Sequence, residues 1–430
     1  MQLELSVFIL VGLLFILLVG GLEIAVVLGV CGLTGVLLLL HQPPFVFARI
    51  SWGVSYSFIL TAVPLFIFMG EIFLNSGISE RLFEGLAKWV GSLPGGLAST
   101  VVVACGTFAA ISGSSPATAA TIGAFSLPEM EKRGYERRLA YGVLAAGGTL
   151  GILIPPSVTM IIYGSWAGVS VVELFKAGLI PGIMLAGLFI IMIMVRVKLR
   201  PSLAPRLPTA PLRERLIALG DIAPWFLIIG AVLGGIMLGI TTPTEAAAVG
   251  VICALLASLA YRRLSFNVIK KSALASVQLT CMIMLLIFGA KLFAYVFLYL
   301  QVPTIVAGAL LALTVSKYVI IASICAVYLI LGCIFDPLSM LVLTMPFVIP
   351  IVTKLGFDLV WFGVIFVMCA EAGMITPPVG FNLYVLLGLD KRATLGEVAR
   401  GSLPFLAMMV VAIALIVAFP QIALWLPSLG

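Results

Sequence analysis

Residues 112–116 read SGSSP, which places three hydroxyl side chains, a glycine and a proline inside a strongly apolar chain. Apolar residues make up 63% of the 430 residues, charged residues only 10%, and the mean hydropathy is +1.28. Because soluble domains carry about 25% charged residues, this composition indicates a polytopic membrane protein. Apolar runs of membrane-spanning length recur from end to end. We therefore expect an all-α fold that forms a single membrane domain over residues 1–430.

The lysine and arginine residues cluster in five loops. These loops hold 19 of the 24 basic residues and lie at 75–93, 129–138, 196–215, 261–271 and 387–400. By the positive-inside rule the five loops are cytoplasmic, which places both termini outside. Topology thereby explains the net charge of +7, so membrane lipid is an expected partner and nucleic acid is not.

This topology requires two segments that enter and leave the membrane on the same side. Residues 94–130 lie between two basic loops and are predicted to form a re-entrant hairpin with SGSSP at its tip. The same reasoning makes 317–353 a second hairpin, which enters from outside and has GCIFDP at its tip. Irregular backbone cannot face lipid, so both tips must be buried in protein or line a wet cavity.

A shift of 222 residues aligns the two halves of the chain. It places Ser114 on Asp336, Gly151 on Gly373, and the proline pair 155–156 on the pair 377–378. We therefore expect two repeats, 1–195 and 222–430, joined by a cytoplasmic linker at 196–221. The first repeat starts outside and the second inside, and inverted repeats of this kind are typical of secondary transporters.

Each hairpin is followed by a predicted broken span, at GILIPPS (151–157) and GMITPPV (373–379). A proline inside a helix lacks the N–H that bonds the carbonyl four residues earlier. This frees four carbonyls, those of Gly151, Ile152, Gly373 and Met374. Free carbonyls beside hydroxyl groups suit a small hard cation such as sodium. A plain proline kink, repaired by water or neighbouring helices, is the alternative.

The hairpin tips supply a complementary feature. Ser115 followed by Pro116 is predicted to be an N-cap and a first helical residue, so a half-helix would begin there and attract anions. Asp336 and Pro337 repeat the pattern with a carboxylate, which we expect to bind a cation or a substrate hydroxyl or amine. Capping alone is the alternative for Asp336. Glu71, Lys291 and Glu371 are interpreted as structural residues.

Four motifs resemble signatures of the large membrane subunit of TRAP transporters, the tripartite ATP-independent periplasmic family. They are ISGSSPATAATIG (111–123), GILIPPS, TTPTEAAAVG (241–250) and AGMITPPVGFNLYV (372–385). The resemblance covers essentially the whole chain. It implies an elevator-type sodium symporter for a small organic anion, such as a C4-dicarboxylate or sialic acid, with a fold like that of divalent anion sodium symporters. It also implies two partners, a small four-helix membrane subunit and a periplasmic substrate-binding protein, and a location in the bacterial inner membrane with both termini periplasmic.

The resemblance also implies roles for individual residues. Sodium would lie around the tips and broken spans, at Ser112, Ser114, Gly151, Gly332, Gly373 and Thr376. The organic anion would contact Ser115, Asp336 and Ser157. The transported sodium ion is the only cofactor expected.

Three other functions are compatible with a polytopic membrane protein. A stand-alone sodium and anion symporter, working without a binding protein, has the same chemistry. An intramembrane enzyme is disfavoured because the chain has one histidine and no HExxH motif. A channel is disfavoured because inverted repeats with broken helices indicate alternating access.

Overall fold

The computed structural model describes residues 2–205, 208–312 and 315–429 and contains helices but no strands in this part of the chain. Residues 206–207 of the predicted linker lie outside the described residues. The first repeat contains α1 (Gln2–Val19), α2 (Ile24–Thr34), α3 (Phe45–Ser55), α4 (Ala62–Ser76), α5 (Ser79–Val90), α6 (Leu97–Ser112), α7 (Ser115–Lys132), α8 (Arg137–Leu153), α9 (Val158–Ala167) and α10 (Val171–Leu199).

Helix α10 ends at Leu199 and α11 begins at Leu212, so both helices run into the predicted linker 196–221, and the connection between them is shorter than predicted. The second repeat follows this connection. It contains α11 (Leu212–Ile229), α12 (Gly235–Met237), α13 (Pro243–Ala260), α14 (Phe266–Tyr299), α15 (Val302–Leu311), α16 (Lys317–Gly332), α17 (Pro337–Lys354), α18 (Leu359–Met374), α19 (Phe381–Leu389), α20 (Leu395–Ala418) and α21 (Gln421–Leu424). Within the described ranges, seven helices are long and apolar enough to cross a membrane, and α8 with α9 adds a pair bent by 42°. The predicted all-α polytopic membrane fold is confirmed.

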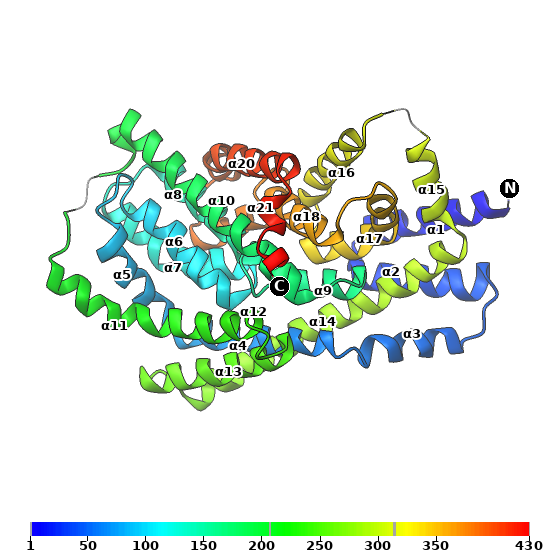
Figure 1. The fold of residues 1–430 in the computed structure, drawn as a ribbon, viewed down its shortest axis with the longest axis horizontal. Helices are drawn as coiled ribbons and strands as arrows, with labels where there is room; N and C mark the ends of the chain where they lie inside the picture. The colour runs from blue at the N-terminus through cyan, green and yellow to red at the C-terminus, as the bar shows by residue number, and fades with distance from the viewer. Residues whose placement is uncertain (1, 206–207, 313–314, 430) are drawn as a thin grey trace.

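The helices form two groups (Figure 1). We call α2, α3, α4, α11, α13 and α14 the lower layer, because most of them run along the bottom of the view, with α2 packed on α14 and α4 packed on α13 and α14. We call α6 to α10 and α16 to α21 the upper bundle. Its helix α8 packs against α6, α7 and α20, and α16 packs against α18. The cavity described below lies between the two groups.

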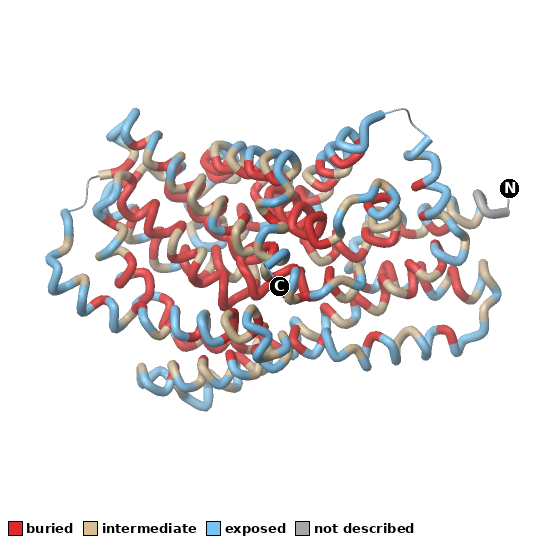
Figure 2. The backbone as a smooth tube through the Cα atoms, viewed as in Figure 1, coloured by how far each residue is buried: buried red, intermediate tan, exposed pale blue. Residues whose placement is uncertain are grey.

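The core of the upper bundle is formed by two helices that the 222-residue shift makes equivalent. Every residue of 139–153 in α8 and of 360–374 in α18 is buried, and the buried tube segments concentrate in this region (Figure 2). A helix that is apolar on all sides is stable only when other elements surround it. The two helices that carry the broken spans are therefore the most enclosed elements of the fold.

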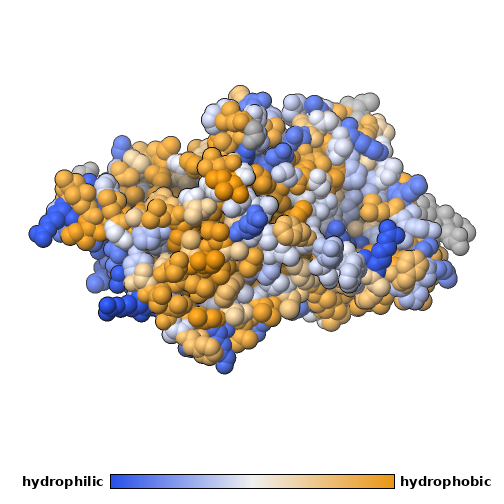
Figure 3. All heavy atoms as spheres, turned by 60° about the horizontal axis from the view of Figure 1, so that its bottom comes forward, coloured by the Kyte–Doolittle hydropathy of each residue, from blue (hydrophilic) through white to orange (hydrophobic). Residues whose placement is uncertain are grey.

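The lower layer presents apolar side chains outward. Figure 3 shows a broad hydrophobic surface on the face turned forward from the bottom of Figure 1. Exposed apolar residues of α11 include Leu212, Leu216, Ile217, Phe226 and Leu227. Such a surface is unfavourable in water but suits contact with lipid or another membrane helix.

Close helix crossings depend on glycine at two points. A Cβ built on Gly289 of α14 would lie 2.6 Å from the Ala25 carbonyl oxygen of α2. A Cβ on Gly142 of α8 would collide with the Gly401 carbonyl oxygen of α20. Small residues at such crossings allow the two backbones to approach closely.

The two predicted hairpins are helix pairs in the structure. Helices α6 and α7 pack on each other around Gly113 and Ser114, and α16 and α17 pack around residues 333–336. Gly113 has φ +58°, a left-handed conformation that glycine adopts without strain. The depth of the tips in a membrane stays a prediction.

The N-cap of α7 differs from the prediction. Ser114, not Ser115, caps the helix, and its Oγ accepts a hydrogen bond from the Ala117 N–H at 3.5 Å. Ser115 and Pro116 are the first two helical residues. In α17 the predicted cap is present, because Asp336 Oδ2 accepts from the N–H groups of Leu338 and Ser339 at 3.0 and 3.1 Å. The 222-residue shift therefore pairs two N-caps, Ser114 and Asp336.

Candidate functional site

A cavity of about 510 Å³ lies where the lower layer meets the upper bundle. The lower layer contributes residues of α2, α4 and α14, and the upper bundle contributes both hairpin tips, the break between α8 and α9, and the ends of α18 and α19. Its size is within the range of about 300–1,000 Å³ typical of small-molecule sites. Elements from both repeats thus converge on one cavity.

The structure brings only part of the predicted site residues to the cavity. Five of them line it: Ser112, Ser114, Ile152, Asp336 and Met374. The other six, which do not line it, are Ser115, Ser157, Gly151, Gly332, Gly373 and Thr376. Four of these six, Ser115, Gly151, Ser157 and Gly373, are chain neighbours of lining residues.

Predicted sodium residues of the first repeat form a compact group. A Cβ built on Gly151 would lie 2.6 Å from the Ser114 carbonyl oxygen, so α8 touches the hairpin tip through backbone. The Ser112 hydroxyl lies 2.8 Å from the Thr118 hydroxyl and 3.4 Å from the Ser114 carbonyl oxygen. No described backbone N–H donates to the Gly151 or Ile152 carbonyl, as the proline rule predicts.

The second repeat has the corresponding contact. A Cβ on Gly373 of α18 would collide with the backbone of Gly332 at the end of α16. The Thr376 hydroxyl donates to the Ala372 carbonyl at 2.6 Å. The prediction that the Gly373 carbonyl is free is wrong, because the Thr376 N–H donates to it at 3.0 Å. A short turn forms there before the proline pair 377–378, so one lone pair of this oxygen is occupied.

Two residues predicted to bind substrate face other partners. Ser115 is fully buried and accepts a hydrogen bond from the Asn382 side-chain amide at 2.8 Å. Ser157 is also fully buried, and its Oγ accepts from the Met160 N–H at 3.3 Å, as the N-cap of α9. The hydroxyl that reaches the cavity at this point belongs to Thr159, two residues later.

Ser115 and Asn382 are part of a buried polar group that includes Glu371. Glu371 is 1% exposed, and neither oxygen of its carboxylate has a hydrogen-bond partner among the described residues, although the Ser115 side chain lies beside it. The Asn382 amide also donates to the Ala145 carbonyl at 3.2 Å. This group joins hairpin one and α8 to α18 and α19 of the other repeat.

The cavity wall contains four polar residues that sequence reasoning missed as site residues: Glu23, Glu71, Thr159 and Ser339. Glu71 was interpreted as structural because a carboxylate in an apolar helix has no informative neighbours in the sequence. Glu23 had one signal, since the repeat shift aligns it with Glu245. Thr159 and Ser339 have no distinguishing sequence pattern.

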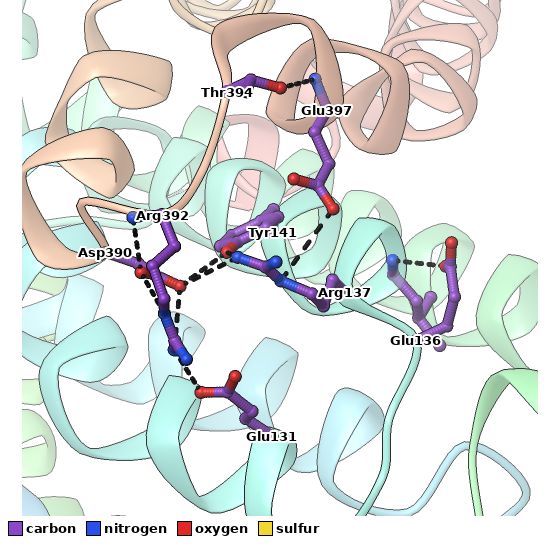
Figure 4. Close-up of polar contacts among 9 residues, drawn as sticks. Glu131, Glu136, Arg137, Tyr141, Asp390, Arg392, Thr394 and Glu397 are labelled. Atoms are coloured by element: carbon purple, nitrogen blue, oxygen red, sulfur yellow. Dashed lines mark hydrogen bonds and ion pairs between the residues drawn. The ribbon is translucent and has the colours of Figure 1, made fainter.

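A second polar cluster lies at the other end of the upper bundle (Figure 4). Asp390 accepts hydrogen bonds from Arg392 at 3.1 Å, from the Tyr141 hydroxyl at 2.8 Å and from Arg137 at 3.2 Å. Arg392 also donates to Glu131 at 2.7 Å. The hydrogen bonds from Arg392, followed by that from Tyr141, hold the pKa of the Asp390 carboxyl well below its usual range. By the topology predicted from charge, this cluster is cytoplasmic.

Comparison with known proteins agrees with these features. The family model described as the DctM component of the tripartite ATP-independent periplasmic transporter matches residues 11–422. The C4-dicarboxylate TRAP transporter large permease protein DctM of Pseudomonas aeruginosa is 36% identical, with 92% of this chain and 93% of that protein covered. The sialic acid TRAP transporter large permease protein SiaM of Vibrio cholerae is 33% identical, with 87% of each chain covered.

A solved structure shares the fold. The YdaH transporter of Alcanivorax borkumensis, whose structure has an unusual topology, superposes with a TM-score of 0.58 over 85% of this chain and 86% of that one, at 16% identity. This likeness concerns the fold alone. The full-length family match and the identity to curated relatives show that the chain belongs to the large permease subunits of TRAP transporters, the DctM family.

Proposed function

We propose that this permease carries out sodium-coupled import of a small organic anion through the cavity between the lower layer and the upper bundle. The main support for this proposal is that both hairpin tips and both broken spans contribute residues to this cavity. In each repeat the glycine before the proline pair touches the backbone of a hairpin, Gly151 that of Ser114 and Gly373 that of Gly332. Repeat-related broken helices at one site support a secondary transporter.

The proposed mechanism is an elevator. The upper bundle moves as the transport domain against the lower layer, which stays fixed as the scaffold. Sodium binds first, at the two contacts between a hairpin tip and a broken span, where it is held by carbonyl and hydroxyl oxygens. The bound cations then offset the negative charge of the cavity, so the substrate anion can approach the N-terminus of α7.

The driving force follows from the charge moved. A membrane potential of 100 mV supplies about 2.3 kcal/mol for each net positive charge that crosses inward. Transport of more sodium charge than substrate charge therefore concentrates the substrate inside the cell. The relatives named for C4-dicarboxylates and sialic acid support a carboxylate as the substrate.

Two partners belong to the proposal because the family is tripartite. A small four-helix membrane subunit would cover part of the apolar face of the lower layer, and a periplasmic binding protein would deliver the substrate to the outer side. The bacterial inner membrane is the site of action, and no enzymatic activity is proposed.

The test is uptake into proteoliposomes that contain the permease and the small subunit, with the cognate binding protein and its radiolabelled ligand outside. We expect uptake with an inward sodium gradient, faster uptake when the interior is negative, and none when potassium replaces sodium. Uptake that is independent of sodium would refute the coupling. Full uptake without the binding protein would favour the stand-alone symporter instead.

A further inference from the structure

The charged residues on the cavity wall are all acidic. Three carboxylates line it, those of Glu23, Glu71 and Asp336, and no lysine, arginine or histidine is among its described lining residues. Lys291 of α14 lies further along the helix, where its ammonium group packs 5.3 Å from the centre of the Trp166 ring. Among the described lining residues, a substrate in this cavity therefore meets acidic side chains and no basic ones.

These carboxylates retain acceptor capacity for a ligand. Asp336 uses Oδ2 for both hydrogen bonds to the start of α17, and no described group donates to its Oδ1. Glu71 accepts from the Asn75 amide through Oε2 at 3.1 Å, and no described group donates to its Oε1. Glu71 belongs to the lower layer and Asp336 to the upper bundle, so a cationic group between them would contact both helix groups.

Two buried hydroxyl groups complete the wall. Thr159 is 2% exposed and Ser339 is 3% exposed, both line the cavity, and neither hydroxyl has a hydrogen-bond partner in the described structure. Both side chains line the cavity and neither hydroxyl has a described protein partner, so both can form hydrogen bonds with the polar groups of a ligand or with water in the cavity.

The wall also contains a place for a negative group. Residues 112–114, 116 and 117 at the tip of hairpin one line the cavity at the N-terminus of α7. Among the described N–H groups of the first turn of α7, only that of Ala117 has a side-chain cap. An N-terminal helix end attracts anions. The equivalent end of α17 already has the Asp336 carboxylate. The two tips therefore differ in charge preference across one cavity.

We propose that the substrate of this permease is a zwitterion, an organic acid that also carries an ammonium group. The acid group lies at the N-terminus of α7, and the ammonium group lies between Glu71 and Asp336. This inference rests on the proposed function, because it assumes that the cavity is the substrate site.

The test uses pairs of compounds that differ only by a hydroxyl or an ammonium group, L-malate with L-aspartate and isethionate with taurine. Binding is measured as thermal stabilisation of the complex of permease and small subunit, without the binding protein and at fixed sodium concentration. We expect the amino member of at least one pair to bind about tenfold or more tightly than its hydroxy partner.

Two variants assign this preference to the cavity. Glu71→Gln keeps the shape of the side chain but removes its charge, and it should cut the preference for the amino member about tenfold. Glu84→Gln changes an exposed carboxylate of α5 that does not line the cavity, and it should leave the preference unchanged.

Three results would overturn the proposal. The first is that both hydroxy compounds bind as tightly as their amino partners or more tightly. The second is that neither amino compound stabilises the complex at concentrations of tens of millimolar. The third is that Glu71→Gln leaves the preference for the amino compound intact. If the pairs bind equally and Glu71→Gln instead raises the sodium concentration needed for half-saturation, the carboxylates hold an additional cation. If the wild-type proteoliposomes take up no ligand when a sodium gradient is applied, the proposed function itself is refuted.

Discussion

Gly373 allows α18 to touch the tip of hairpin two, and Gly373→Ala tests whether this contact forms a sodium site. A methyl group at position 373 would lie 2.5 Å from the Gly332 carbonyl carbon and 2.9 Å from its oxygen. Both atoms are backbone, so no side-chain rotation can make room. The tip of hairpin two must therefore move away from α18.

The size of the effect follows from two opposing terms. Overpacking a buried contact costs about 1–3 kcal/mol, whereas alanine is favoured over glycine in a helix by about 1 kcal/mol. We expect a net loss of stability of up to about 2 kcal/mol. If sodium binds at this contact, the same displacement weakens sodium binding, about tenfold for each 1.4 kcal/mol of binding free energy that is lost.

The assay is thermal unfolding of the purified permease in detergent across a sodium chloride titration, with potassium chloride holding ionic strength constant. Gly187→Ala is the matched control, because it lies inside α10 and an added Cβ there meets no atom within 4 Å. The control should keep the sodium response of the wild type and gain slightly in stability.

Two outcomes separate the backbone contact from the sodium site. A Gly373→Ala protein that gains about 1 kcal/mol, as an unopposed change from glycine to alanine in a helix does, would refute the close backbone contact. A less stable variant with an unchanged sodium titration would keep the contact but refute a sodium site beside it.

Three further predictions follow from the buried polar groups and the helix crossing. Glu371→Gln should fold with at least wild-type stability, because it removes a buried carboxylate that has no described partner, whereas Glu371→Ala should lose about 2–3 kcal/mol through the cavity it leaves; a large loss in the glutamine variant would show that the charge is needed. Asp390→Asn should lower stability at neutral pH, because the folded pKa of this carboxyl lies below its unfolded value of about 3.9. Its deficit should be constant above that pH and shrink as pH falls toward the folded pKa, and a deficit that grows in acid would contradict this. Gly142→Ala should separate α8 from α20 and lower the yield of folded protein, measured as the monodisperse peak in size-exclusion chromatography. Gly220→Ala, at an open position of α11, should leave that yield unchanged.

The overall fold was accessible from the sequence because its signals are chemical and repeated. Charge placement predicted the two hairpins, and the 222-residue shift correctly paired the two caps, Ser114 and Asp336. The assignment of the first cap to Ser115 was wrong by one residue, because a serine pair before a proline offers two hydroxyls in nearly the same register. Only the backbone decides which of them is extended and which is helical.

The cavity was less accessible because its wall combines distant segments. Glu71 and Asp336 are far apart in the chain, and no spacing rule relates a residue of α4 to the cap of α17. Ser157 and Thr159 are two residues apart, and the one that caps α9 cannot also face the cavity. Motifs therefore identified the segments that form the site, whereas the packed structure was needed to show which side chains of these segments line the cavity.

Hairpin one is fastened to the second repeat at both ends of α7. Near its start Ser115 bonds Asn382, which is 267 residues later, and near its end Glu131 bonds Arg392, which is 261 residues later. A ribosome adds about 5–20 residues per second, so the newly made hairpin spends on the order of tens of seconds without these contacts. During biogenesis its hydroxyl-rich tip must be sheltered by the insertion machinery or by neighbouring helices of its own half, and a truncated chain ending before α19 would leave that tip permanently undocked.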